Sequence, residues 1–311
     1  MRFWVMGPAW VLFVLASLAT AARARLRKGN LASTDKDKLR KSEDKYLDFI
    51  YGNSRLTVVS RIHGASATQL ADSAAVLSFL HSVKGYASRV ILCIGVGDEL
   101  EHVDYLNFLQ KVIATEEFPE FQLVLLPVVP WGKFTSALNA AVTKVAERGD
   151  GLVVFQSLEF RISRDAVKSL VEYLSRDESI LVIGPRMKGH DFSPGDNVLE
   201  LRGRTCPWNT FAIWRTKYLA LTGFPLVSDG MGGNMGGVEE VTAITLLQQI
   251  KPNLQAVLAG ISDGVSSWDT NFSDPKRMQW HQDKMRSKDD RPAKQLEWLN
   301  MSGKVRHVQL Q

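Results

Sequence analysis

Short runs of consecutive apolar residues alternate along the chain with longer stretches in which apolar residues recur every three or four positions. The short runs are typical of strands buried on both faces of a sheet, and the longer spacing is typical of amphipathic helices. We expect strands at 55–62, 90–94, 121–126, 152–155 and 180–183, and helices at 66–83, 106–113, 134–145 and 163–174.

This alternation of strand and helix predicts an α/β fold with right-handed crossovers and a mostly parallel sheet flanked by helices. The pattern changes after residue 185. We expect short strands at 198–201 and 210–213, antiparallel at the edge of the sheet, followed by a glycine-rich loop at 229–237. A helix that begins at Glu239 and a last strand at 255–258 complete this part of the chain.

Three further segments have compositions of their own. The globular domain is expected to cover 55–270, and the charged segment 271–311 is expected to form a C-terminal helical extension. Residues 29–54, rich in Lys, Asp and Ser, are expected to form a stem or linker.

The first 28 residues contain an apolar stretch, 3–22, with basic residues on both sides. It is long enough to span a bilayer as a helix, and it ends in small residues typical of signal-peptidase sites. A cleaved signal peptide and a single membrane anchor are therefore both open. Either one predicts the secretory pathway, in the lumen of the Golgi or the endoplasmic reticulum. Glycosylation triplets at Asn271 and Asn300 agree with this location.

The 311 residues carry a formal net charge of +5, which favours an anionic ligand or an anionic membrane surface. Much of the basic excess lies in the first 45 residues, and no stripe of Lys and Arg interleaved with aromatic residues follows. Nucleic acid is therefore not an expected partner. The two cysteines, Cys93 and Cys206, do not have the spacing of a metal site.

A polar tip, Ser157-Leu158-Glu159, directly follows the apolar run at 152–155. Ligands of open α/β sheets bind just beyond the carboxyl ends of the strands. We therefore expect Glu159 to face a ligand site, with a solvent-facing glutamate at the end of a strand as the alternative.

Four segments occur in an informative order: Gly97-Asp98, the run GKFTSALN at 132–139, the tip at 157–159, and a series formed by 212–215, Gly223-Phe224 and Glu239-Glu240. In this order, from about residue 57 to 259, the chain resembles inverting glycosyltransferases of family 2. The resemblance implies the GT-A fold of nucleotide-diphospho-sugar transferases. It also implies transfer of a sugar from a nucleotide-sugar donor to a hydroxyl of a glycan, protein or lipid acceptor.

The resemblance further implies a divalent cation, Mn²⁺ or Mg²⁺, which neutralises the diphosphate leaving group. The family carries Asp-x-Asp where this chain has 157–159, so a serine replaces the first carboxylate. Glu159 would then hold the metal, with Ser157 as a weaker ligand. His281 matches a C-terminal histidine ligand, and a surface histidine beside a packed tryptophan is the alternative.

Other positions are implied to contact the donor. On the nucleotide side these are Arg61, His63, Asp98, Lys133 and Asn139. Lys133 lies near the start of a helix, where a diphosphate could meet the positive end of the helix dipole. A solvated lysine is the alternative for Lys133, and a turn-forming aspartate is the alternative for Asp98.

Two residues near the expected strand at 210–213 are also assigned to the substrate site. Trp208 could stack on a sugar ring, although core packing is equally open for it and for Trp214. Arg215 ends the segment 212–215 and is expected to contact the donor.

Glu240, with Glu239 beside it, matches the position of the catalytic base. An inverting transfer needs one carboxylate that takes the proton of the attacking hydroxyl. The positive end of a helix dipole keeps a carboxylate ionised there. The same dipole supports the alternative, in which both acids only stabilise the helix start.

The sequence leaves two alternative functions open. A non-catalytic relative that kept the fold and binds a glycan or a partner protein is favoured by the serine at position 157. A Rossmann-type nucleotide-binding enzyme has little support, because no Gly-x-Gly-x-x-Gly follows the first strand.

Overall fold

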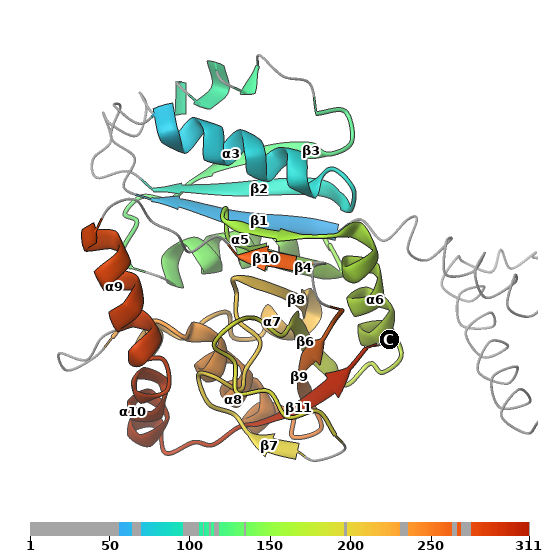
Figure 1. The fold of residues 1–311 in the computed structure, drawn as a ribbon, viewed down its shortest axis with the longest axis vertical. Coiled ribbons are helices and arrows are strands. Elements are labelled where there is room, and N and C mark those ends of the chain that lie inside the picture. The colour runs from blue at the N-terminus through green and yellow to red at the C-terminus, as the bar shows by residue number, and fades with distance from the viewer. Residues whose placement is uncertain are drawn as a thin grey trace, which may run out of the picture. The chain divides into compact units, whose positions relative to one another are not determined.

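A nine-stranded sheet organises the protein, in the order β3-β2-β1-β4-β8-β6-β9-β11-β7 (Figure 1). Its strands are β1 (Leu56–His63), β2 (Ala87–Gly95), β3 (Gln122–Pro127), β4 (Leu152–Gln156), β6 (Ile180–Pro185), β7 (Val198–Glu200), β8 (Phe211–Arg215), β9 (Gln255–Gly260) and β11 (Lys304–Gln309). All neighbouring pairs are parallel except those that involve β8 or β7.

The structure, a computed structural model, describes residues 56–63, 70–95, 106–107, 109–111, 113–114, 118–133, 135–195, 198–230, 236–262, 266–268 and 275–310. It does not describe the side chains of 63, 70–73, 268, 275–277 and 280–281. The expected signal or anchor at 1–28, the stem at 29–54 and Asp98 lie outside the described residues. Among the helices that are described, none is long and apolar enough to cross a membrane.

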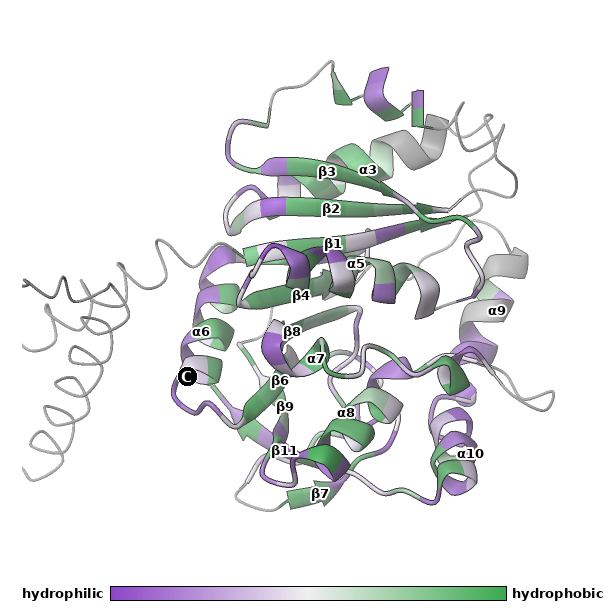
Figure 2. Ribbon diagram, turned by 180° about the vertical axis from the view of Figure 1, so that it is seen from behind, coloured by the Kyte–Doolittle hydropathy of each residue, from purple (hydrophilic) through white to green (hydrophobic). Residues whose placement is uncertain are grey.

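Strand and helix alternate through the first part of the chain, as expected. The helices are α3 (Leu70–Val83), α5 (Thr135–Glu147) and α6 (Arg164–Ser175), and α3 and α5 lie on opposite faces of the sheet (Figures 1 and 2). The Ser163 hydroxyl accepts a hydrogen bond from the backbone N–H of Ala166 at 3.2 Å, which confirms it as the N-cap of α6. A separate two-stranded sheet pairs β5 (Phe160–Ile162) with β10 (Ser266–Trp268).

The central strands are apolar along most of their length (Figure 2). In β1 the polar residues Ser60 and Arg61 come near its carboxyl end, after the buried Val58 and Val59. Because β1, β2, β3 and β4 run parallel, their carboxyl ends meet at one edge of the sheet. This edge carries the candidate site.

The strand expected at 210–213 was wrongly predicted to be an outermost strand of the sheet. It forms β8, which lies between β4 and β6 and runs antiparallel to both. All five of its residues are buried, as a strand covered on both faces requires. The expectation for 198–201 is confirmed, because β7 is the edge strand and pairs antiparallel with β11.

The C-terminal region is helical over α9 (Pro275–Arg286) and α10 (Asp290–Leu299), but it ends in a strand that the sequence analysis did not predict. This strand, β11, runs parallel to β9 inside the main sheet. Val305 and His307 alternate with more exposed residues and are buried. His307 also accepts the Ser193 backbone N–H at 3.0 Å and bonds the Thr205 carbonyl at 2.9 Å. The described residues belong to one compact unit, Leu56–Gln311.

The remaining elements connect the sheet to the site: the short helix α7 (Thr216–Leu219), the 3-10 helix η1 (Leu226–Asp229) and α8 (Glu239–Ile250). Helix α8 begins where the glycine-rich segment ends, and α10 packs against it. The C-terminal helices therefore reach the start of α8, although they come about 40 residues later in the chain.

Because β11 is an inner strand, Val305→Asp should lower the free energy of unfolding by at least about 3 kcal/mol through an unpaired buried charge. Urea denaturation followed by circular dichroism measures this change. Lys304→Ala, on the same strand but exposed, should change stability by less than about 0.5 kcal/mol. Equal stability of Val305→Asp and the parent chain would contradict the placement of β11.

Candidate functional site

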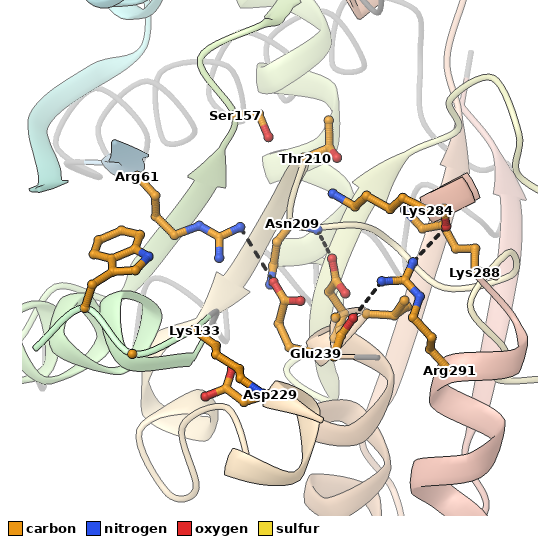
Figure 3. A pocket seen from close by; sticks show the side chains of 16 residues that line it. Arg61, Lys133, Ser157, Asn209, Thr210, Asp229, Glu239, Lys284, Lys288 and Arg291 are labelled. Carbon is orange, nitrogen blue, oxygen red and sulfur yellow. Dashed lines mark hydrogen bonds and ion pairs between the residues drawn. The ribbon is translucent and has the colours of Figure 1, made fainter. Parts of the chain in front are cut away.

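A pocket of about 670 Å³ opens at the carboxyl edge of the sheet. The strands contribute Arg61 from β1, Ser157 after β4, and Asn209 and Thr210 before β8. Lys133 and Glu239 come from the loop before α5 and from the start of α8. Figure 3 shows Arg61 on one side of Glu239, and three basic residues of the C-terminal helices on the other.

Two adjacent carboxylates, Glu239 and Glu240, line the pocket and are each only 5% exposed. The backbone N–H of Asn209 donates to Oε1 of Glu240, and its side-chain amide donates to Oε1 of Glu239 at 3.4 Å. The amide oxygen of Asn209 accepts from the indole of Trp214 at 2.9 Å, which fixes the amide in place. Oε2 of Glu240 is buried and has no hydrogen-bond partner in the described part of the protein.

This carboxyl group is electrostatically unusual. Burial, and after it the neighbouring charge of Glu239, raise the pKa of Glu240 above its ordinary value of 4.5. The Lys288 ammonium and the N–H of Asn209 partly offset this increase. Glu240 can therefore change its protonation state closer to neutral pH than an ordinary glutamate.

Val238 precedes the two glutamates in a left-handed conformation, with φ of 62° and ψ of 40°. A β-branched residue rarely adopts this conformation, which costs on the order of 1–3 kcal/mol. Backbone strain of this kind concentrates at functional sites. It directs the chain so that α8 begins with both carboxylates inside the pocket.

The other wall is basic. Lys284, Lys288 and Arg291 follow one another at spacings of four and three residues across the junction of α9 and α10, and all three line the pocket. Arg291 donates to the Gly236 carbonyl at 2.8 Å and to the Lys284 carbonyl at 2.8 Å, which ties the glycine-rich segment to the C-terminal helices. Burial lowers the pKa of both lysines.

Arg61 and Lys133 were expected at the site and line the pocket, as does Ser157. The guanidinium of Arg61 lies 3.8 Å from Oε1 of Glu239. Trp131 also lines the pocket, although the sequence analysis did not single it out. It packs on Gly95 at the end of β2 so closely that a Cβ there would lie 2.0 Å from the indole ring.

The N-terminus of α5 is already occupied by a protein carboxylate. Asp229 accepts hydrogen bonds from the Thr135 backbone N–H at 2.9 Å and from the Thr135 hydroxyl at 2.6 Å. An acidic group at this position complements the helix dipole. The expected contact between a diphosphate and this helix start, beside Lys133, is therefore taken by Asp229.

Glu159 lies in a second, smaller pocket of about 100 Å³, which shares Arg61, Ser157 and Asn209 with the larger one. Glu159 and Glu240 thus line adjoining hollows at the same edge of the sheet. The metal expected here needs several oxygen ligands. Within the described residues, no group of three or more His, Cys, Asp or Glu side chains could hold a metal ion. The ligand set of the described residues does not fit a protein-held metal centre.

Three expected site residues have structural roles instead. The amide of Asn139 donates to the Phe224 carbonyl at 2.9 Å and accepts from the Phe224 N–H at 2.7 Å. It therefore holds the turn at Gly223, where φ is +60° and a Cβ would lie 2.5 Å from the amide oxygen of Asn139. The run at 132–139 thus ends in a residue that fixes this turn, and Asn139 does not line the pocket.

Trp208 is 1% exposed and packs in the core, so it offers no face to a sugar. Its ring stacks on His190 at 3.6 Å, and the Lys288 ammonium lies 3.3 Å from the ring centroid.

Arg215 lies at the opposite edge of the sheet, because β8 runs antiparallel to its neighbours and Arg215 pairs with Leu152 at the start of β4. Its guanidinium donates to the Ile180 carbonyl at 2.9 Å and the Leu174 carbonyl at 2.7 Å.

Asp98 and the side chains of His63 and His281 lie outside the described residues, so their expected roles stay predictions. The residues that sequence reasoning missed are Trp131, Asn209, Asp229, Lys284, Lys288 and Arg291. The only signal in the sequence was the spacing of the last three, which would put them on one face of a continuous helix, although the structure places Lys288 between α9 and α10.

Comparisons with known proteins give structural likeness only. No family model and no curated protein matches the chain. A mannosyltransferase from Pyrobaculum calidifontis, PcManGT, whose structure contains GDP-Man and Mn²⁺, aligns with a TM-score of 0.53 and 13% identity. The alignment covers 78% of this chain and 64% of the mannosyltransferase, less than two thirds of its length. A mycobacterial protein aligns at a TM-score of 0.41 and 12% identity, over 73% of this chain and 72% of its own.

The chain has a glycosyltransferase-like fold. Its large, mostly parallel sheet flanked by helices matches the expected GT-A class, and the mannosyltransferase is a structural neighbour. At 13% identity the likeness shows the fold and leaves the reaction to be argued from the site.

Asn139→Ala should lower the free energy of unfolding by about 1–3 kcal/mol, because it leaves the Phe224 backbone groups without partners. Urea denaturation measures the loss, with the exposed Thr143→Ala on the same helix as the control. Nucleotide affinity of the folded variant should equal that of the parent chain. A folded variant that loses nucleotide binding would return Asn139 to the site.

Proposed function

We propose that this protein is an inverting glycosyltransferase, which moves a sugar from a nucleotide-diphosphate donor to the hydroxyl group of an acceptor. The observation that carries the proposal is the state of Glu240. One of its oxygens is fixed by a backbone N–H, and the other is buried at the pocket with no hydrogen-bond partner among the described residues.

The position of the pocket supports a nucleotide-sugar as the donor. It lies beyond the carboxyl ends of parallel strands, where ligands of open α/β sheets bind. A structural neighbour with a TM-score of 0.53 is a mannosyltransferase in complex with GDP-Man. A volume of about 670 Å³ is within the range of small-molecule and cofactor sites.

Glu240 would act as the general base. The acceptor hydroxyl attacks the anomeric carbon and forms a new C–O bond, while the bond to the donor phosphate breaks and its electron pair leaves with the nucleoside diphosphate. Oε2 of Glu240 takes the hydroxyl proton, and Oε1 stays bonded to Asn209. A base is most effective when its pKa lies near the working pH, and burial moves the pKa of Glu240 in that direction.

A second candidate is a non-catalytic relative that binds a glycan or a partner protein. Ser157 favours it, because this side chain lines the pocket, and the family that the sequence resembles carries an aspartate at the matching position. Calorimetric titration with UDP, GDP and their sugars, with and without Mn²⁺, separates the two candidates. Binding of a nucleotide supports the enzyme, and glycan binding without any nucleotide binding supports the second candidate.

Replacing Glu240 by Gln should reduce sugar transfer roughly 10²- to 10⁴-fold, because a carboxamide cannot take the proton. Nucleotide affinity should be nearly unchanged, since Gln can still accept the Asn209 N–H. Transfer is measured as release of nucleoside diphosphate in the presence of acceptor. Glu147→Gln, an exposed acid on α5, serves as the control. Full activity of the Glu240→Gln variant would show that this carboxylate is not the base.

The rate of transfer should depend on pH through the ionisation of Glu240. Glu240 must be ionised to act, so the rate should rise with pH through a limb that lies above 4.5, the ordinary value for a glutamate. The charges of Glu239 and Lys288 act on Glu240, and those of Lys284 and Arg291 act on Lys288. The pH at which the rate rises therefore depends on all of these interacting groups together.

Glu239→Gln should move the acid limb to lower pH, because it removes the neighbouring negative charge that raises the pKa of Glu240. The measurement is the rate of transfer between about pH 4 and pH 9, a range that spans the ordinary pKa values of Glu and His. An acid limb near 4.5 in both proteins would contradict a perturbed Glu240.

A further inference from the structure

We propose that the pocket binds the diphosphate of its donor through the ammonium and guanidinium groups of the C-terminal helices, and without a divalent metal ion. The proposal rests on the function proposed above. It states which side chains bind the diphosphate in place of the Mn²⁺ ion that the structure of the mannosyltransferase contains. The residues concerned are Lys284, Lys288 and Arg291, opposite Arg61.

The carboxylates of the pocket already interact with other groups of the protein. Both oxygens of Asp229 accept hydrogen bonds from Thr135. Glu239 accepts from Asn209 and lies 3.8 Å from the guanidinium of Arg61. Oε1 of Glu240 accepts the Asn209 backbone N–H, and burial raises the pKa of this carboxyl group, which makes it a weaker metal ligand than an ordinary carboxylate.

Glu159, the expected metal ligand, is in an unfavourable place for a cation. It lines the smaller pocket together with Arg61, whose guanidinium carries a permanent positive charge. A divalent ion at Glu159 would be repelled by this guanidinium. A serine, a much weaker ligand, stands at position 157 beside it.

Lys288 is the observation that points to an anion. Its side chain lines the pocket, the residue is only 5% exposed, and its ammonium lies over the Trp208 ring at 3.3 Å. No described carboxylate lies within ion-pair distance of it. Burial lowers the pKa of this ammonium group, and the charge of the Glu240 carboxylate offsets the effect only in part. A bound diphosphate would supply the missing negative charge.

The basic wall is also held rigidly. The turn at Gly203 packs on the junction of α9 and α10 so closely that a Cβ on Gly203 would lie 1.9 Å from the Lys288 carbonyl oxygen. Arg204 donates its backbone N–H to Asp289 at 2.8 Å, and the two side chains form an ion pair at 3.5 Å. Cations fixed before binding lose little entropy when the ligand arrives, which favours affinity.

The same cations suit the chemical step. When the bond between sugar and phosphate breaks, negative charge grows on the leaving diphosphate. Two ammonium groups and a guanidinium placed at that charge provide the electrostatic stabilisation that a metal ion supplies in metal-dependent enzymes.

Isothermal titration calorimetry of the full chain with UDP and GDP tests the proposal, once in EDTA and once in Mn²⁺. We expect the affinity in EDTA to equal or exceed that in Mn²⁺, because the metal competes with the cations of the pocket for the diphosphate. Glu159→Gln should leave the affinity unchanged. Binding that requires Mn²⁺ and is lost in Glu159→Gln overturns this proposal and leaves the proposed glycosyltransferase standing.

Charge removal provides the second test. Lys288→Gln and Lys284→Gln should each weaken nucleotide binding in EDTA roughly 10- to 100-fold, the range for one hydrogen bond to a charged group. Lys294→Gln, exposed on α10 and outside the pocket, is the matched control and should bind like the parent chain. Thermal melts establish that each variant is folded, and the less buried Lys284 keeps the test valid if Lys288→Gln does not fold.

The outcomes separate the two proposals. Unchanged affinity of folded Lys284→Gln overturns diphosphate binding by this wall, whatever the metal dependence. Absence of nucleotide binding in both EDTA and Mn²⁺ overturns this proposal and the proposed transferase together.

Discussion

Two neighbouring carboxylates kept out of water at the start of one helix set the main constraint on this molecule. Glu239 and Glu240 are each 5% exposed, and burial of such groups is unfavourable unless they are hydrogen-bonded or protonated. Asn209 satisfies one oxygen of each, and Trp214 holds the amide of Asn209 in turn. Strand β8 runs antiparallel to β4 in the middle of the sheet, so Asn209, which precedes β8, lies beside the carboxyl end of β4.

The alternation of apolar runs and amphipathic stretches was enough to predict the first half of the sheet, because each of these strands contains a continuous apolar run. The same rule failed for β11, where Arg306 and a buried His307 separate the two apolar residues, Val305 and Val308. It also could not place β8, since a short apolar strand looks the same whether it pairs at the edge or at the centre. Strand order depends on tertiary packing, which local patterns do not carry.

The site was predictable where it depends on strand ends and was hidden where it depends on long-range packing. Arg61 and Ser157 follow directly from the carboxyl edge of a parallel sheet. Lys288 does not, because nothing in a charged helical segment says that one of its lysines will be buried beside Trp208. Arg215 shows the converse case. It belongs to a sequence segment that was assigned to the site, but β8 runs antiparallel to β4, so Arg215 lies beside the start of β4, away from the pocket. Family motifs therefore located the region, and geometry decided which of their members face the pocket.

The position of β11 has a consequence for how the molecule is made. Of all the described elements it is translated last, yet β7 pairs with no strand but β11, and β9 has it as one of its two neighbours. Domains begin to fold while the ribosome is still extending them, from the N-terminal side. Here the nascent chain would wait with the outer side of β9 unpaired until residues 304–309 emerge. A polypeptide released early by a premature stop codon would expose that bare strand edge to pairing with other chains, which is a recognised route to aggregation.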